Sequence, residues 1–151
     1  MKEFVKLLEK IGIAHELHDG RVVVTGYADF SGCTALTAIG NGVTFGGWAD
    51  FDGCTALTTI GDNVTFNDWA DFSACAALPG AQHNCGNERL TIYAVMCSDG
   101  VVRANLGCQR LTRAEAIAAI SRKYGNTPAG AEYISKAAAA FDYAEGYWVK
   151  P

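Results

Sequence analysis

The middle of this 151-residue sequence has no lysine or arginine. Residues 22–88 carry seven acidic side chains and no basic one, whereas residues 1–21 are balanced and residues 89–151 carry eight basic and five acidic side chains, for a net charge of −4. An acidic segment repels phosphates, which argues against direct nucleic-acid binding. It indicates that the middle of the chain faces either its own basic end or a basic partner.

Long apolar runs are also missing. No stretch reaches the roughly 18 apolar residues that would span a bilayer, and the N-terminus has no basic segment followed by an apolar one of the secretory type. We therefore expect a cytoplasmic chain with no membrane partner. The length suits one domain, or two small fused units.

Six cysteines are present, but in none of the spacings that indicate chemistry. A disulfide framework is typical of small secreted chains, and no Cys-x-x-Cys pair occurs. Cys33, Cys54 and Cys75 recur at equal intervals, which favours packing as small apolar residues. The zinc alternative, judged by residue type, consists of His83, Cys85, Cys97 and Cys108. We predict no metal and no cofactor.

No catalytic arrangement stands out either. The available candidates are Cys-His pairs drawn from Cys85, Cys97, His83, His15 and His18. Nothing in the sequence positions such a pair or supplies an oxyanion site. We predict that the protein is not an enzyme; a small enzyme or a zinc-binding protein is the third interpretation.

What the sequence does contain is a strict repeat of 21 residues. Aromatic residues, aspartates, phenylalanines, cysteines and leucines each recur three times at this interval, without insertions. The positions are Tyr27, Trp48 and Trp69; Asp29, Asp50 and Asp71; Phe30, Phe51 and Phe72; Cys33, Cys54 and Cys75; Leu36, Leu57 and Leu78. Such regularity is typical of a solenoid, whose coils stack through equivalent side chains.

Within each coil, residues 48–51 and their equivalents read as a short strand. Ala49 and Phe51 then point inward, while Trp48 and Asp50 point outward. Because paired strands lie roughly 4.8 Å apart, equivalent residues should form ladders. Two of these ladders are outward rows, one of aromatic residues and one of aspartates, and a third is a buried row of cysteines.

Residues 51–60, Phe-Asp-Gly-Cys-Thr-Ala-Leu-Thr-Thr-Ile, are followed by Val64 and then by Trp69-Ala-Asp-Phe72. This string resembles the BspA-like class of short leucine-rich repeats, whose units read as an aromatic or aliphatic residue, a cysteine and then Leu-x-x-Ile. The resemblance covers residues 22–80. It implies a binding scaffold without chemistry of its own.

The ends of a three-coil stack require caps. Residues 2–11 have apolar side chains at helical spacing and predict an amphipathic helix. A hairpin around His18-Asp19-Gly20 would lead from this helix into the repeat. Residues 1–21 are therefore the predicted N-terminal cap.

After residue 80 the repeat stops, and a different pattern begins. Ser98-Asp99-Gly100 predicts a hairpin between residues 90–97 and 101–106. Thr112-Arg-Ala-Glu115 is a capping box that opens a helix to about Tyr124, and Thr127-Pro128 opens a last helix to about Tyr143. Residues 81–151 are thus predicted to form a ββαα capping unit.

The C-terminal unit carries a second resemblance. Its segments Asp99-Gly-Val-Val-Arg103, Gly107-Cys108, Leu111–Ile117 and Arg122-Lys-Tyr-Gly125 resemble the C-terminal piece of small phage and prophage repeat proteins of unassigned role. The resemblance implies a mobile-element origin. Some small acidic proteins of that origin act on host machinery.

The outward aspartate row is the sharpest functional feature. Stacked carboxylates repel one another, so a cation is expected to face them; the plain alternative is that they only keep the strand face soluble. The cation could come from Arg89, Arg103, Arg110 and Arg113 or from a basic partner. The exposed aromatic row is also expected to be covered. The covering group could be the C-terminal unit, a protein or peptide, a sugar, or a second copy of the chain.

We predict an α+β fold: a short leucine-rich-repeat-like solenoid of about three coils over residues 22–80, with the two caps at its ends. The predicted function is a non-enzymatic protein–protein interaction module that binds a protein with a basic surface. The predicted contact residues are Tyr27, Asp29, Trp48, Asp50, Trp69 and Asp71. The alternative is a phage-derived, anti-CRISPR-like inhibitor that occupies the basic or nucleic-acid-binding surface of a host defence protein.

Overall fold

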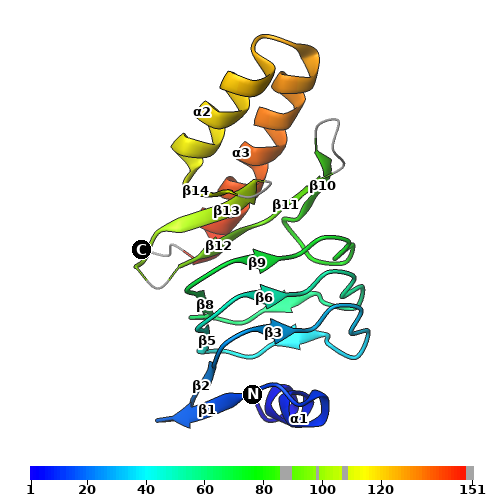
Figure 1. Ribbon diagram of the computed structural model, residues 1–151, viewed down its shortest axis with the longest axis vertical. Coiled ribbons are helices and arrows are strands. Elements are labelled where there is room, and N and C mark those ends of the chain that lie inside the picture. The colour runs from blue at the N-terminus through cyan, green and yellow to red at the C-terminus, as the bar shows by residue number, and fades with distance from the viewer. Residues whose placement is uncertain (86–89, 98, 107–108, 149–151) are drawn as a thin grey trace.

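A computed structural model of the chain describes residues 1–85, 90–97, 99–106 and 109–148. Over these residues the fold is mixed α+β, with three helices and several small sheets, which confirms the predicted class. Helix α1 (Lys2–Ile11) lies at one end of the molecule, and α2 (Arg113–Tyr124) and α3 (Pro128–Trp148) extend from the other (Figure 1). In the described part of the chain, no helix has both the length and the apolar character needed to cross a membrane.

The N-terminal cap has the predicted form. Strands β1 (His15–His18) and β2 (Arg21–Val24) pair as an antiparallel hairpin next to α1. The apolar side of α1 is buried, and its Phe4 ring lies 6.1 Å from the ring of Phe30 in the first repeat unit. The helix therefore closes one end of the repeat by apolar packing.

Between residues 22 and 71, strands of successive repeat units pair in parallel (Figure 1). One sheet continues from β1 and β2 through β5 (Val43–Phe45) and β8 (Thr65–Phe66); a second contains β3 (Ala28–Asp29), β6 (Ala49–Asp50) and β9 (Ala70–Asp71); a third contains β4 (Ala38–Ile39) and β7 (Thr59–Ile60). In all three sheets, partners in the parallel ladders are 21 residues apart. The third ladder was not among the strands predicted from the sequence.

Two columns of phenylalanine rings fill the interior of the repeat. Phe30, Phe51 and Phe72 stack with ring centroids 5.0 and 4.9 Å apart, and Phe45 stacks on Phe66 at 4.9 Å. The ring of Tyr93, 21 residues beyond Phe72, continues the first column at 4.7 Å. The C-terminal unit therefore supplies a fourth ring at the repeat interval, which the sequence-based prediction did not include.

The repeated cysteines link neighbouring repeat units. The buried thiols of Cys54 and Cys75 each donate to a carbonyl oxygen of the preceding unit, that of Phe30 and that of Phe51, at 3.1 Å in both cases. Cys33, in the first unit, is half-buried. A thiol that both packs and donates explains why cysteine recurs at a position where packing alone would accept alanine.

The predicted ββαα pattern has too few strands. Strands β10 (Gln82–Cys85) and β11 (Leu90–Ile92) pair with each other, and β12 (Ala94–Met96), β13 (Val102–Leu106) and β14 (Gln109–Leu111) form an antiparallel sheet. The predicted hairpin is β12–β13. The strand predicted over residues 90–97 is divided into β11 and β12, because its side chains pack alternately in two cores. Ile92 packs with the helices, and Tyr93 packs with the repeat.

Both predicted C-terminal helices are present. Thr112 and Glu115 form the capping box of α2, and the Thr127 hydroxyl oxygen accepts a hydrogen bond from the N–H of Gly130 in the first turn of α3. Helix α3 ends at Trp148 rather than near Tyr143. The extra turn is held against the repeat, where Trp148 packs on its core.

Polar side chains of the C-terminal unit reach the last strand of each parallel ladder. Asn105 donates to the carbonyl of Ala70 on β9, Arg110 donates to that of Phe66 on β8 at 2.6 Å, and the Tyr147 hydroxyl donates to that of Ile60 on β7. In a longer repeat these edges would meet the backbone of another unit. The C-terminal unit therefore ends the stack with side-chain donors, together with a parallel β-bridge between Phe66 and Cys97.

Gly80 lies 21 residues after Thr59, where the third repeat unit would begin its last strand. Its φ of +85° turns the chain instead, and a Cβ built at this position would lie 2.2 Å from the Tyr143 ring. Glycine therefore lets α3 pack where the third ladder would otherwise continue.

Candidate binding face

The acidic-aromatic face is the outward side of the β3-β6-β9 sheet. Its residues are Tyr27, Trp48, Trp69, Asp29, Asp50 and Asp71. Alternation along each strand buries the alanines and phenylalanines and turns the residues between them outward. Parallel pairing then sets Asp50 directly between Asp29 and Asp71. The structure brings all six predicted contact residues together on one face.

The aromatic row is open over most of its length. Ring centroids of Tyr27 and Trp48 are 6.1 Å apart, as are those of Trp48 and Trp69. Tyr27 is 59% exposed and Trp48 is 52% exposed, whereas Trp69 is half-buried beside the C-terminal unit. The C-terminal unit therefore stands at the end of the row and does not cover Tyr27 or Trp48.

Each aspartate of the face holds the turn that follows its strand. The Oδ1 atoms of Asp29, Asp50 and Asp71 accept the backbone N–H two residues further on, at 2.9 Å in each unit. The hydroxyls of Ser31 and Ser73 donate to the same oxygens. This is an Asx turn, in which the carboxylate stands in for a backbone carbonyl. The recurrence of aspartate therefore has a structural cause, the Asx turn, which was not predicted. The Asp-x-Ser spacing at residues 29–31 and 71–73 was the available signal for it.

The second repeat unit has an extra carboxylate, because Asp52 occupies the position of Ser31 and Ser73. Burial raises the pKa of Asp52, and the negative charges of Asp71 and Asp50 raise it further. In the first unit the opposite holds, since donation from the hydroxyl and backbone N–H of Ser31 lowers the pKa of Asp29. Negative charge is therefore most crowded at the centre of the face.

The described arginines proposed as internal partners are engaged elsewhere. Arg103 pairs with Asp99 at 2.8 Å, and its donation, with that of a backbone N–H, lowers the pKa of Asp99 to about 2. Arg110 donates to the Phe66 carbonyl, and Arg113 pairs with Asp142 and Glu145. Arg89 lies outside the described residues. Pairing of the aspartate row with Arg103, Arg110 or Arg113 is therefore not observed.

A small hollow of about 120 Å³ lies where the face meets the C-terminal unit. Its lining comprises Trp69, Ala70, Asp71, Phe72, Ser73, Thr91, Tyr93 and Asn105. An aromatic ring, a carboxylate and a carboxamide thus converge at the end of the two rows. The volume suits a single side chain rather than a whole small-molecule ligand.

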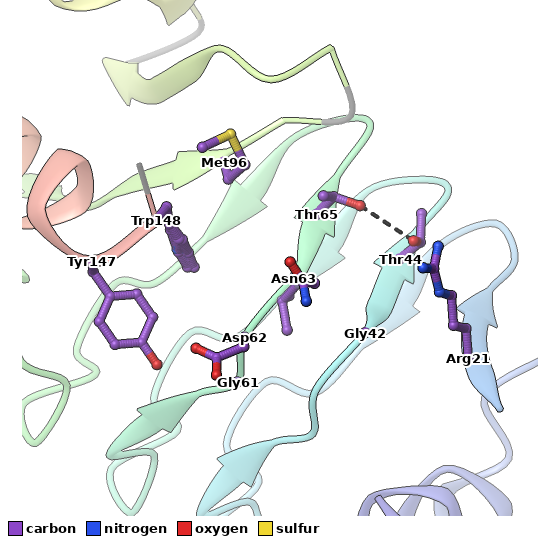
Figure 2. A pocket seen from close by; sticks show the side chains of 11 residues that line it. Arg21, Gly42, Thr44, Gly61, Asp62, Asn63, Thr65, Met96, Tyr147 and Trp148 are labelled. Atoms are coloured by element: carbon purple, nitrogen blue, oxygen red, sulfur yellow. Dashed lines mark hydrogen bonds between the residues drawn. The ribbon is translucent and has the colours of Figure 1, made fainter. Parts of the chain in front are cut away.

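A larger groove of about 630 Å³ lies on the outward side of β5 and β8 (Figure 2). The Thr65 hydroxyl donates to Thr44 on its floor at 3.2 Å, and the side chains of Tyr147 and Trp148 close one end, away from Arg21. This groove was not predicted, because the last helix was expected to end near Tyr143, before Tyr147 and Trp148. The aromatic pair at residues 147–148 was the available signal.

The cysteine and histidine candidates do not form a site among the described residues. The described cysteines are free thiols, and no three His, Cys, Asp or Glu side chains in this part of the chain are grouped to hold a metal. The His83 side chain and Cys108 lie outside the described residues. His15 and His18 are on β1 beside α1, whereas Cys85 is on β10 and Cys97 follows β12, both in the C-terminal unit (Figure 1).

Comparison with family models, with curated proteins and with solved structures finds no match for this chain. The functional proposal therefore rests on the geometry and charge of the acidic-aromatic face.

Proposed function

We propose that residues 22–80 form a short solenoid and that the protein is a non-enzymatic binding module for a basic partner protein. The observation that carries the proposal is the exposure of Tyr27 and Trp48, 59% and 52%, beside a row of carboxylates on a paired β-sheet. The solenoid assignment draws on the 21-residue register shared by three parallel ladders. Repeat scaffolds of this kind present rigid, extended surfaces.

The aromatic row supports binding because more than half of the surface of Tyr27 and of Trp48 is exposed to water. A tryptophan ring carries a large apolar surface, and tryptophan and tyrosine are enriched at the centres of protein interfaces. The Trp48 ring contacts the rings of Tyr27 and Trp69, both on the same face. A partner that covers the row would remove this apolar surface from water.

The charge of the face supports a basic partner. The segment 22–85, all of which the structure describes, contains six aspartates and no lysine or arginine. The turn hydrogen bonds occupy one carboxylate oxygen, Oδ1, in each unit. Opposite charge on a partner would relieve the crowding around Asp52 and guide association at low salt.

Capture of partners from host lysate tests the proposal. We expect the wild-type chain to retain a basic protein at about 0.1 M salt and to release it at about 1 M, because the Debye length shrinks from about 10 Å to about 3 Å. A variant with Trp48→Ala and Asp50→Asn should lose the partner and keep its fold. Asparagine is chosen because its side-chain oxygen can still accept the turn N–H.

Leu17→Ala provides the matched control. Leu17 is an exposed apolar residue on β1, away from the acidic-aromatic face. It should leave capture unchanged. Equal capture by the Trp48 and Asp50 double variant would overturn the proposal, and size-exclusion chromatography of each chain would show whether a second copy covers the row instead.

The second candidate is the inhibitor of a host defence protein. The observation that favours it is the succession of carboxylates at Asp29, Asp50 and Asp71, which form a directly paired negative row. Such a row could occupy a surface that otherwise binds nucleic-acid phosphates. DNA that competes with this chain for the captured protein would support this candidate, and gene neighbours unrelated to phage would count against it.

A further inference from the structure

We propose that the acidic-aromatic face binds an extended polypeptide segment with arginines at alternate positions. The segment would run along the two rows, across the strands of the repeat. This inference rests on the proposed function and specifies the chemistry of its partner. It is drawn from the spacing of the rows, the pairing of ring and carboxylate in each unit, and the hollow at the end of the face.

The spacing of the aromatic row matches an extended chain. Successive ring centroids from Tyr27 to Trp48 and from Trp48 to Trp69 are 6.1 Å apart. Alternate side chains on one side of an extended chain are about 6.6–6.8 Å apart. The difference over two steps is about 1 Å, which a flexible arginine side chain absorbs. In a helix, side chains on one face recur three or four residues apart and would not follow the row.

Each repeat unit offers a ring and a carboxylate on the same side of its strand, two residues apart. Trp48 and Asp50 are an example, with Ala49 between them buried. A guanidinium can lie against an aromatic ring while its N–H groups donate to a carboxylate. A lysine ammonium has no planar face to lie against the ring, so arginine is the preferred residue.

The hollow beside Trp69 provides an anchor for one end of the segment. Asp71 lines it with a carboxylate, and Asn105 lines it with a carboxamide whose nitrogen already donates to the Ala70 carbonyl. The carboxamide oxygen is thus the atom of Asn105 left to accept a hydrogen bond. A volume of about 120 Å³ fits one arginine side chain between these groups.

Other occupants fit the face less well. Nucleic acid would bring phosphates against the aspartates. A sugar could stack on the rings but would leave the negative charge without a counter-charge. A second copy of the chain would need arginines at alternate positions of an extended segment, whereas Arg103, Arg110 and Arg113 already bind groups of their own chain. The exposed Arg21 and Arg122 lie singly on β2 and α2.

Synthetic fluorescent peptides test the inference at physiological salt. One peptide carries three arginines alternating with threonines, a second has the same composition with the arginines adjacent, and a third replaces the alternating arginines with lysines. We expect the first to bind at least about 10-fold more tightly than the second and about 3-fold more tightly than the third, where 10-fold corresponds to about 1.4 kcal/mol.

Variants of the full chain locate the binding. The triple variant D29N/D50N/D71N should lose the alternating peptide by at least about 30-fold, since three charge-assisted contacts are weakened while the turn acceptors remain. Asn105→Ala should weaken it by a few-fold, and Leu17→Ala should leave it unchanged.

The outcomes separate this inference from the proposed function. Equal affinity for alternating and adjacent arginines, or no binding of either, overturns the inference. The proposed function still stands in that case if the wild-type chain captures a basic protein that the triple variant does not. If the triple variant captures that protein as well as wild type does, the proposed function falls with the inference.

Discussion

The repeat units are joined to one another by continuous backbone ladders, whereas the C-terminal unit is joined to them by side chains and a β-bridge between Phe66 and Cys97. Between units, the N–H of Phe30 donates to the carbonyl of Asp50, and the N–H of Phe51 donates to that of Asp71, at 2.7 and 2.8 Å. At the last strands, the donors are the side chains of Asn105, Arg110 and Tyr147. The same kind of acceptor is thus satisfied in two ways.

This difference explains how a strict repeat can end after three units. A continued parallel ladder requires a partner with the same period, but a lone bridge or a side chain can reach the last strand from an element that runs in another direction. Three polar side chains therefore cover edges that would otherwise pair with another chain. Because this cap sits on the end of the stack, it leaves the outward faces open, including Tyr27 and Trp48.

Phe51→Ala should have the largest effect, because it breaks the repeat at its centre. The Phe51 ring is fully buried and stacks on Phe30 and Phe72. The expected loss is about 3–5 kcal/mol of unfolding free energy, from lost burial and the cavity left behind. Urea denaturation followed by far-UV circular dichroism measures it. Retention of the full helical signal while the repeat melts would show that the two regions fold independently.

Arg110→Met tests the side-chain attachment and should have a smaller effect. It removes the donor to the Phe66 carbonyl while keeping an unbranched apolar stem over the repeat. We expect a loss of about 1–3 kcal/mol, the cost of leaving a carbonyl at a covered edge without its donor. Arg122→Met, at an exposed position of α2, is the control and should stay within about 0.5 kcal/mol of wild type. Equal values for both variants would mean that the attachment does not depend on the hydrogen bonds of Arg110.

Asp52→Ser should have the smallest effect and should stabilise the protein. It makes the second unit like its neighbours, with a hydroxyl that can donate to Asp50 as Ser31 donates to Asp29. A gain of about 0.5–1 kcal/mol at pH 7 is expected. The folded state raises the pKa of Asp52, so ionised Asp52 costs stability above that pKa, and the cost disappears as the pH falls through it. The gain should therefore shrink in acid, and a gain that grows in acid would contradict the assignment.

The repeat and its caps were largely predictable, because their signals are local or periodic. The 21-residue interval sets the register of the parallel ladders, and Thr112 with Glu115 marks the start of α2. The attachment of the C-terminal unit was not predictable. Its hydrogen bonds join residues 35, 44 and 87 positions apart, and no local pattern specifies such pairs.

The candidate face was predictable in position but not in its chemistry. Alternation and the repeat interval place Trp48 and Asp50 outward. Exposure of Trp48 depends on where the C-terminal unit packs, which the sequence does not reveal. The turn hydrogen bond of Asp50 was missed because the repetition of aspartate was attributed to charge alone.

The central claim is that the negative charge of the acidic-aromatic face serves a partner and not the fold. The direct measurement is the unfolding free energy, at pH 7, of D29N/D50N/D71N and of D29A/D50A/D71A. Asparagine keeps the turn acceptors and removes the repulsion, so the first variant should lie within about 1 kcal/mol of wild type or above it. The second should lose about 2–3 kcal/mol. An equal loss in the asparagine variant would show that the charges are needed inside the fold, which would contradict the claim.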